Sequence, residues 1–134
     1  MRKVIVLSGN EVFAFEKEHW YGWVKRELAK LGFDVIGETM PDPKLARKDF
    51  WLPHIKDVFK AYEEAIIIRH SSGAVATLRF LEGNKLAGAI IVGANYTDLG
   101  LPEEKASGYF DTSWDWNAIK ENAGWIIQFV SQDD

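Results

Sequence analysis

One stretch of the sequence combines residue types that could carry out nucleophilic chemistry. Residues 65–74 have the sequence AIIIRHSSGA, in which a short apolar run is followed by a polar turn and then by apolar residues at helical spacing. This order predicts a buried strand, a sharp turn and a helix. In such a turn the first serine, Ser71, holds its hydroxyl above the sheet, and the backbone N–H groups that open the helix point towards negative charge. An activated serine nucleophile would sit at this position.

The turn differs from the G-x-S-x-G pattern at one position, because Arg69 replaces the first glycine. Small residues are favoured there because neighbouring backbone lies close and the serine is held at unusual backbone angles. We expect the Arg69 side chain to point outwards or to widen the turn. The alternative interpretation is that Ser71 or Ser72 only caps a helix that follows a buried strand.

The elements that must position this turn alternate along the chain. Apolar or β-rich runs predict strands, and apolar residues at helical spacing predict helices between them. The predicted strands cover residues 3–7, 33–40, 65–68, 86–94 and 125–130, and the predicted helices cover residues 20–31, 44–62, 74–82 and 116–122. We expect the second strand to lie at a sheet edge, Pro53 to kink or restart the second helix, and Asp115 to cap the last helix.

This alternation predicts an α/β fold, a three-layer sandwich with a mostly parallel sheet of about five strands and helices on both faces. The ligand site of such a sheet lies beyond the carboxyl ends of its strands. Three polar groups fall at those ends, namely Gly9 with Asn10, His70 with Ser71 and Ser72, and Asp133 with Asp134. Their convergence favours the nucleophile interpretation of the turn.

The composition limits the function classes. A length of 134 residues predicts a single domain over residues 1–134. The net charge of −4, without a basic cluster, argues against nucleic acid as a partner. The sequence has no cysteine, no signal peptide pattern and no apolar run long enough to span a membrane, so we expect a cytoplasmic protein that does not contact membranes. We expect neither a metal nor a cofactor.

A long polar and aromatic connection at residues 95–116 suggests other functions. Connections of this length are often lids or binding loops. Several aromatic side chains look exposed and would suit a hydrophobic recognition surface, although core packing explains any one of them equally well: Tyr96, Tyr109, Phe110, Trp114 and Trp116. One alternative is therefore a catalytically inactive binding or protein-interaction module. Another is a flavodoxin-like binder of a phosphorylated ligand, for which the sequence carries no flavin or phosphate-loop signature.

Several segments, taken together, resemble one family. They are WYGWVKREL, MPDP, WLP, IIIRHSSGA, TDLG, KASGYF with the later WDW, and IIQFVSQDD, and they span nearly the whole chain. In this order they are similar to the small serine hydrolases typified by retinoblastoma-binding protein 9. The resemblance implies an α/β-hydrolase fold without a large cap domain.

The resemblance also implies a Ser-His-Asp triad that attacks an ester or amide carbonyl of a small-molecule substrate. Ser71 matches the nucleophile and Asp134 matches the acid. The backbone N–H of Ser72 and one from the loop around Asn10 would hold the oxyanion. We expect the pocket around them to be lined by Gly9, His70 and Trp116.

The general base is the part of the triad that these residues do not supply. In the family it is a histidine in a segment after the acid, and this sequence ends at Asp134. We expect the base to come from outside this chain or from His19, which ends the loop after the first strand. His70 is expected to pack beside the site, and His54 to be structural. Glu11 would bring a negative charge towards the oxyanion position.

The last predicted strand has implications for assembly. Without a neighbouring strand it becomes an edge, where Ile126, Ile127, Phe129 and Val130 lose cover. Burying such side chains typically contributes about 1.5–3 kcal/mol each, so their exposure weakens a monomer. We therefore expect a homo-oligomer.

Overall fold

The computed structural model describes residues 2–93, 100 and 102–130, and for Ser72, Glu103 and Glu104 it describes the backbone alone. The strands are β1 Lys3–Leu7, β2 Asp34–Ile36, β3 Ile66–His70, β4 Gly88–Val92 and β5 Ile126–Phe129. The α-helices are α1 Tyr21–Lys30, α2 Lys48–Pro53, α3 Ser72–Leu81, α4 Pro102–Ala106 and α5 Trp116–Asn122. A 3₁₀ segment, η1 Phe15–Lys17, precedes α1, and a π-helical segment, η2 His54–Val58, continues α2.

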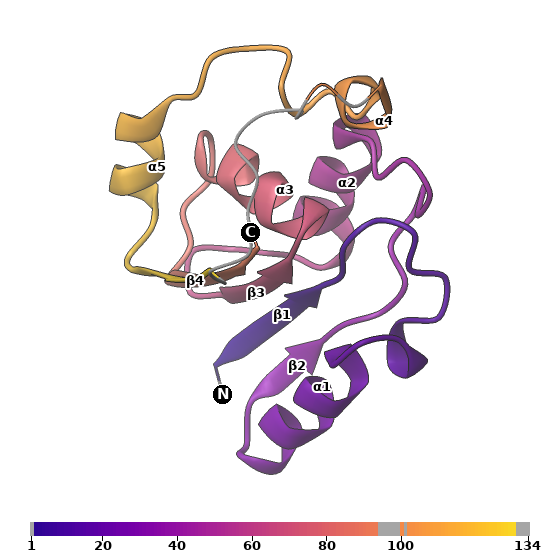
Figure 1. The fold of residues 1–134 in the computed structure, drawn as a ribbon. Coiled ribbons are helices and arrows are strands. Elements are labelled where there is room, and N and C mark those ends of the chain that lie inside the picture. Colours follow the sequence, from indigo (N-terminus) through magenta and orange to yellow (C-terminus); the bar gives the residue numbers. More distant parts are fainter. Residues whose placement is uncertain (1, 94–99, 101, 131–134) are drawn as a thin grey trace.

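The strands form one parallel sheet in the order β2-β1-β3-β4-β5. In its register Ile5 lies beside Ile67, and Ile67 lies beside Ala89. Each strand is followed by helical structure before the next one begins (Figure 1). The arrangement confirms the predicted α/β fold and places β2 at an edge, as predicted.

Different helices pack on the two faces of the sheet, with α1 beneath β1 and β2 on one side and α2, α3 and α5 on the other (Figure 1). On one face, Ile5, Ile67 and Ile91 join the larger core cluster, which includes side chains of α2, α3 and α5. On the other face, Val6 packs with Tyr21 of α1 and with the loop after β1. This division follows from strand alternation, because successive side chains point to opposite faces.

One predicted helix differs in detail from the structure, and one predicted cap is confirmed. The expected helix at residues 44–62 is shorter and changes at Pro53 from α-helical to π-helical, where the Phe59 N–H donates to the His54 carbonyl at 3.0 Å. Proline has no N–H with which to continue the α-helical ladder, which accounts for the change. The predicted cap of the last helix is confirmed, because the Asp115 carboxylate accepts from the Ala118 N–H at 3.1 Å.

Parallel strands bring their carboxyl ends to one edge of the sheet, and the Ser71 turn and the loop after β1 lie together there. Among the helices in the described ranges, none is long and apolar enough to cross a membrane.

Candidate active site

Ser71 joins β3 to α3 through a strained turn. Its backbone angles are φ 54° and ψ −120°, a conformation that costs a residue with a side chain about 1–3 kcal/mol. The turn is held by two backbone hydrogen bonds, from the Ser71 N–H to the Val92 carbonyl at 3.0 Å and from the Ala74 N–H to the Ser71 carbonyl at 2.8 Å. The Ser71 hydroxyl makes no capping hydrogen bond to α3. The interpretation of Ser71 as an ordinary helix cap is therefore wrong.

Two glycines allow β1 to pack directly against this turn. A Cβ added to Gly73 would lie 2.7 Å from the Ser8 carbonyl oxygen, which is closer than real contacts allow. A Cβ added to Gly9 would lie 3.0 Å from the Ser71 Cβ and 3.6 Å from its Oγ. The loop after β1 and the first turn of α3 thus meet closely, with no space for a side chain at either glycine.

Arg69 is completely buried, which corrects the expectation that it would point outwards. Strand alternation is the reason, because residues 67 and 69 share the face of β3 that is covered by the larger core cluster. The three guanidinium nitrogens have no hydrogen-bond partner within the described part of the chain. Burial lowers the pKa of Arg69 well below its usual value, and a nearby Tyr109 opposes the shift.

The loop after β1 is anchored on its other side to the segment after β2. Asn10 is half-buried in the turn, and Glu11 is exposed with φ 60°. The Glu11 N–H donates to the Pro43 carbonyl at 2.6 Å. Pro43 is in turn positioned by the neighbouring Asp42, whose carboxylate accepts from the backbone and guanidinium N–H groups of Arg47 at 2.8–3.2 Å.

An aromatic cluster lies beside the Ser71 turn. The Tyr21 hydroxyl is 2.7 Å from the Nδ1 atom of His70 and accepts from the Gly9 N–H at 3.2 Å. The rings of His19 and Trp20 lie 5.6 and 5.7 Å from the His70 ring. His70 therefore packs beside the site, as expected, and its Nδ1 atom is already engaged. His19 is exposed at the rim of the same cluster.

The sequence analysis missed Tyr21. The available signal was its place at the start of the helix that follows the first strand. A helix that returns from a parallel strand begins at the carboxyl edge of the sheet, so its first side chains can reach the site. The apolar spacing of this helix predicted only which residues face the sheet. It gave no reason to assign a role in the site to Tyr21.

Other predicted residues lie elsewhere. His54 belongs to η2, where its ring packs edge-on against Phe59 at 4.6 Å and burial lowers its pKa, which fits the expected structural role. Trp116 begins α5, directly after Asp115, whose N–H donates to a Glu82 carboxylate oxygen beyond the C-terminal end of α3. Because Ser71 lies at the opposite end of this ten-residue helix, roughly 15 Å long, the structure does not bring Trp116 to the serine. Asp133 and Asp134 lie outside the described residues.

Arg79 of α3 fixes the position of the connection before α5 through hydrogen bonds to its backbone. Its guanidinium donates to the carbonyls of Tyr109, Thr112 and Ser113 at 2.6–3.1 Å and lies 3.7 Å from the Trp114 ring centre. Tyr109 is 1% exposed, so of the two interpretations of its ring, recognition surface or core packing, core packing is confirmed. Trp116, at 42%, is the one described aromatic residue of this connection that is largely exposed. For Tyr109, Phe110 and Trp114 these positions favour the packing interpretation over a recognition surface, whereas Tyr96 lies outside the described residues.

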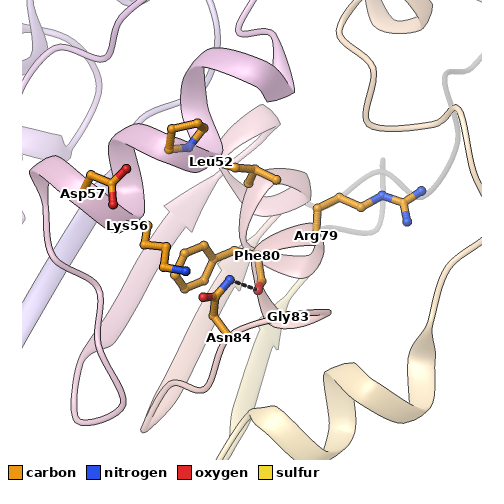
Figure 2. A pocket seen from close by; sticks show the side chains of 8 residues that line it. Leu52, Lys56, Asp57, Arg79, Phe80, Gly83 and Asn84 are labelled. Atoms are coloured by element: carbon orange, nitrogen blue, oxygen red, sulfur yellow. Dashed lines mark hydrogen bonds between the residues drawn. The ribbon is translucent and has the colours of Figure 1, made fainter.

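A cavity of about 330 Å³ lies between the α2–η2 segment and the C-terminal half of α3 (Figure 2). Leu52, Lys56, Phe80 and Asn84 are among its lining residues, and the Asn84 amide donates to the Phe80 carbonyl. It opens near the C-terminal end of α3, whereas Ser71 precedes the N-terminal end. This cavity is therefore separate from the serine. Within the described residues, no cluster of carboxylates and histidines could hold a metal ion.

Comparison with known proteins is consistent with this arrangement. The family described as serine hydrolase matches residues 12–112. Serine hydrolase RBBP9 of Rattus norvegicus is 42% identical over 133 residues, which cover 98% of this chain and 72% of the relative. The putative hydrolase YdeN of Bacillus subtilis is 27% identical over 141 residues, with 99% of this chain and 71% of the relative covered.

A solved structure extends the similarity to the fold. The crystal structure of the ydeN gene product from B. subtilis superimposes with a TM-score of 0.84 at 28% sequence identity, covering 100% of this chain and 73% of the other. The chain thus spans somewhat over seven tenths of the length of the relatives it matches. The family match, the identity to RBBP9 and the shared fold together establish that this chain belongs to the serine hydrolase family.

Proposed function

We propose that this chain carries the nucleophile of a hydrolase that cleaves carboxylic ester or amide bonds in small molecules, with Ser71 as the attacking residue. The strained Ser71 turn is the observation that carries the proposal. A conformation of this cost is retained where the surrounding structure enforces it, and Gly9 and Gly73 provide the close packing that does so. The hydroxyl is not consumed by capping the helix.

The chemistry would proceed in two steps. In the first, the Ser71 oxygen attacks the carbonyl carbon while a general base takes the hydroxyl proton, and collapse of the tetrahedral intermediate releases the alcohol or amine with that proton. In the second, water attacks the acyl-serine ester, the carboxylic acid leaves and the serine regains its proton. Negative charge develops on the carbonyl oxygen in both steps, so N–H donors must lie within about 3 Å of that position.

The Ser72 N–H opens α3 directly after the nucleophile, where the helix dipole also favours negative charge. A second donor is proposed from the loop around Asn10, which Gly9 holds against Ser71. Asp134 is proposed as the acid that orients the base, by its match to the family. The base is proposed to be a histidine outside these 134 residues or His19, whose ring belongs to the cluster beside the turn.

A fluorophosphonate probe tests this proposal, because it forms a stable adduct only with an activated serine. We expect covalent labelling of the purified protein, loss of labelling in Ser71→Ala and retention in Ser113→Ala, which removes an exposed serine hydroxyl. His19→Gln tests His19 as the base, since labelling that survives this substitution excludes His19 from that role. An unlabelled wild-type protein would refute the proposal.

A further inference from the structure

The Tyr21 hydroxyl connects two backbone segments that flank the Ser71 oxygen. It accepts from the N–H of Gly9, in the loop after β1, and lies 2.7 Å from Nδ1 of His70, the residue before the serine. Tyr21 itself belongs to a third element, α1. One buried oxygen thus joins the loop, the end of β3 and a helix that are far apart in sequence.

Donor chemistry fixes the direction of the bond between Gly9 and Tyr21, and it limits the choices for the bond to His70. The Gly9 N–H can only donate, so the Tyr21 oxygen accepts one hydrogen bond. Burial raises the pKa of Tyr21, so the phenol keeps its proton at neutral pH, and His70 Nδ1 is the acceptor within reach. When the Tyr21 hydroxyl donates to it, His70 Nδ1 is unprotonated, and a neutral His70 then carries its proton on Nε2.

The Tyr21 ring is held firmly enough to make this connection specific. The residue is 0% exposed. Its ring stacks on Phe15 at 5.4 Å and 19°, and it meets the Trp20 ring edge-on at 4.9 Å. Contacts on several sides leave the hydroxyl few alternative positions, which is how a supporting residue holds a functional group in place.

We infer that Tyr21 is a positioning residue of the candidate active site. By bonding to Gly9 and His70 it fixes the loop after β1 relative to the Ser71 turn, and so sets where the backbone N–H groups of that loop stand with respect to the serine oxygen. Gly9 transmits the effect because it lies in contact with Ser71. The consequence for catalysis rests on the proposed role of Ser71, whereas the connection itself is a property of the fold.

The test is Tyr21→Phe, which removes the hydroxyl and retains the packed ring. Tyr62→Phe is the matched control, because Tyr62 is 53% exposed. We expect Tyr21→Phe to remain folded, as shown by a cooperative unfolding transition. In hydrogen exchange its Gly9 amide should lose protection. In ¹⁵N NMR its His70 should no longer show the Nε2–H tautomer alone. His70→Asn, whose side-chain oxygen can stand close to the Nδ1 position, should retain Gly9 protection, and His70→Leu should lose it.

The rate of fluorophosphonate labelling at Ser71 provides the functional measurement. Removing two hydrogen bonds of ordinary strength predicts labelling about 5- to 150-fold slower in Tyr21→Phe, and unchanged in Tyr62→Phe. Unchanged Gly9 exchange and an unchanged His70 tautomer in Tyr21→Phe would overturn the inference. If wild-type protein is not labelled at all, the proposed function fails, and the inference is then decided by the exchange and tautomer measurements alone.

Discussion

Arg69 brings a guanidinium into the core beside the Ser71 turn. Its side chain is 0% exposed, and no partner within the described residues accepts its hydrogen bonds. Removing a charge from water is costly when nothing replaces the lost hydration, and the lowered pKa of Arg69 expresses the same penalty. The residue therefore reduces the stability of the element that holds the nucleophile.

Replacing Arg69 by an apolar residue of similar length should remove that penalty. We expect Arg69→Met to raise the free energy of unfolding by at least about 1 kcal/mol, measured by urea denaturation. Arg26→Met, at a side chain that is 61% exposed, should change it by less than about 0.5 kcal/mol. A less stable Arg69→Met protein would show instead that the guanidinium is paired.

The Asp42–Arg47 pair should make stability depend on pH in the acid range. The hydrogen bond from the Arg47 side chain lowers the pKa of Asp42 in the folded protein. A carboxyl whose folded pKa is depressed contributes its full stability above the ordinary value of about 4 and loses it as the pH falls through the folded value. Because this pair positions Pro43, which accepts from the Glu11 N–H, acid should also loosen the loop after β1.

Asp42→Asn tests this dependence and keeps a side chain that tolerates the positive φ of 46° at this position. We expect the variant to be less stable at pH 7 and to lose less stability than wild type between pH 5 and pH 2 in denaturation curves. Asp34→Asn, at an exposed carboxylate, serves as the control and should follow the wild-type profile. Parallel profiles for wild type and Asp42→Asn would contradict the assignment.

At the scale of elements, the contact between β1 and α3 determines the geometry of the turn. Gly73 makes this contact possible, because the Ser8 carbonyl occupies the space that a methyl group would need. Carbonyl oxygens of a central strand cannot move without disturbing the sheet. The position therefore demands glycine for reasons of space, although its own backbone lies in a helix.

Gly73→Ala should displace α3 from β1 and with it the Ser71 turn. We expect a loss of about 1–3 kcal/mol in the free energy of unfolding, typical of overpacking, together with reduced probe labelling. Gly83→Ala is the matched control, since an added Cβ there meets nothing within 4 Å, and it should leave both quantities close to wild type. Full labelling in Gly73→Ala would show that the turn tolerates the displacement.

Across the whole molecule, as far as the described residues extend, β5 forms one edge of the sheet and β2 the other. It pairs with β4 on one side, and its apolar side chains are widely exposed, with Ile127 at 48% and Phe129 at 57%. Both lie on the same face as Ile90 and Val92, their partners in the register. Such an edge favours association with another strand or chain.

We therefore predict that copies of this chain associate through the β5 edge. Size-exclusion chromatography with light scattering at micromolar concentration should report a species larger than a monomer. Ile127→Lys should shift it towards the monomer, because a charged side chain on an edge opposes pairing, and Lys120→Ala in the exposed part of α5 should not. A stable monomeric wild type would contradict this prediction.

Residue patterns were enough to predict the five strands and their order along the chain, although not every boundary. Alternating apolar runs predicted the parallel sheet, Asp115 predicted the cap of α5, and residues 65–74 predicted the strand, turn and helix around Ser71. These features are encoded within about ten residues of one another by periodicity, capping and turn chemistry. They could be read without knowing which segments meet.

The surroundings of the serine, in contrast, depend on how distant segments pack together. The direction of Arg69 depended on which face of β3 the helices cover, and the place of Trp116 depended on where α5 packs against α3. The link from Tyr21 to Gly9 and His70 joins three elements that the sequence separates. Such contacts depend on how segments that are distant in sequence pack against one another, and local residue patterns do not encode that packing.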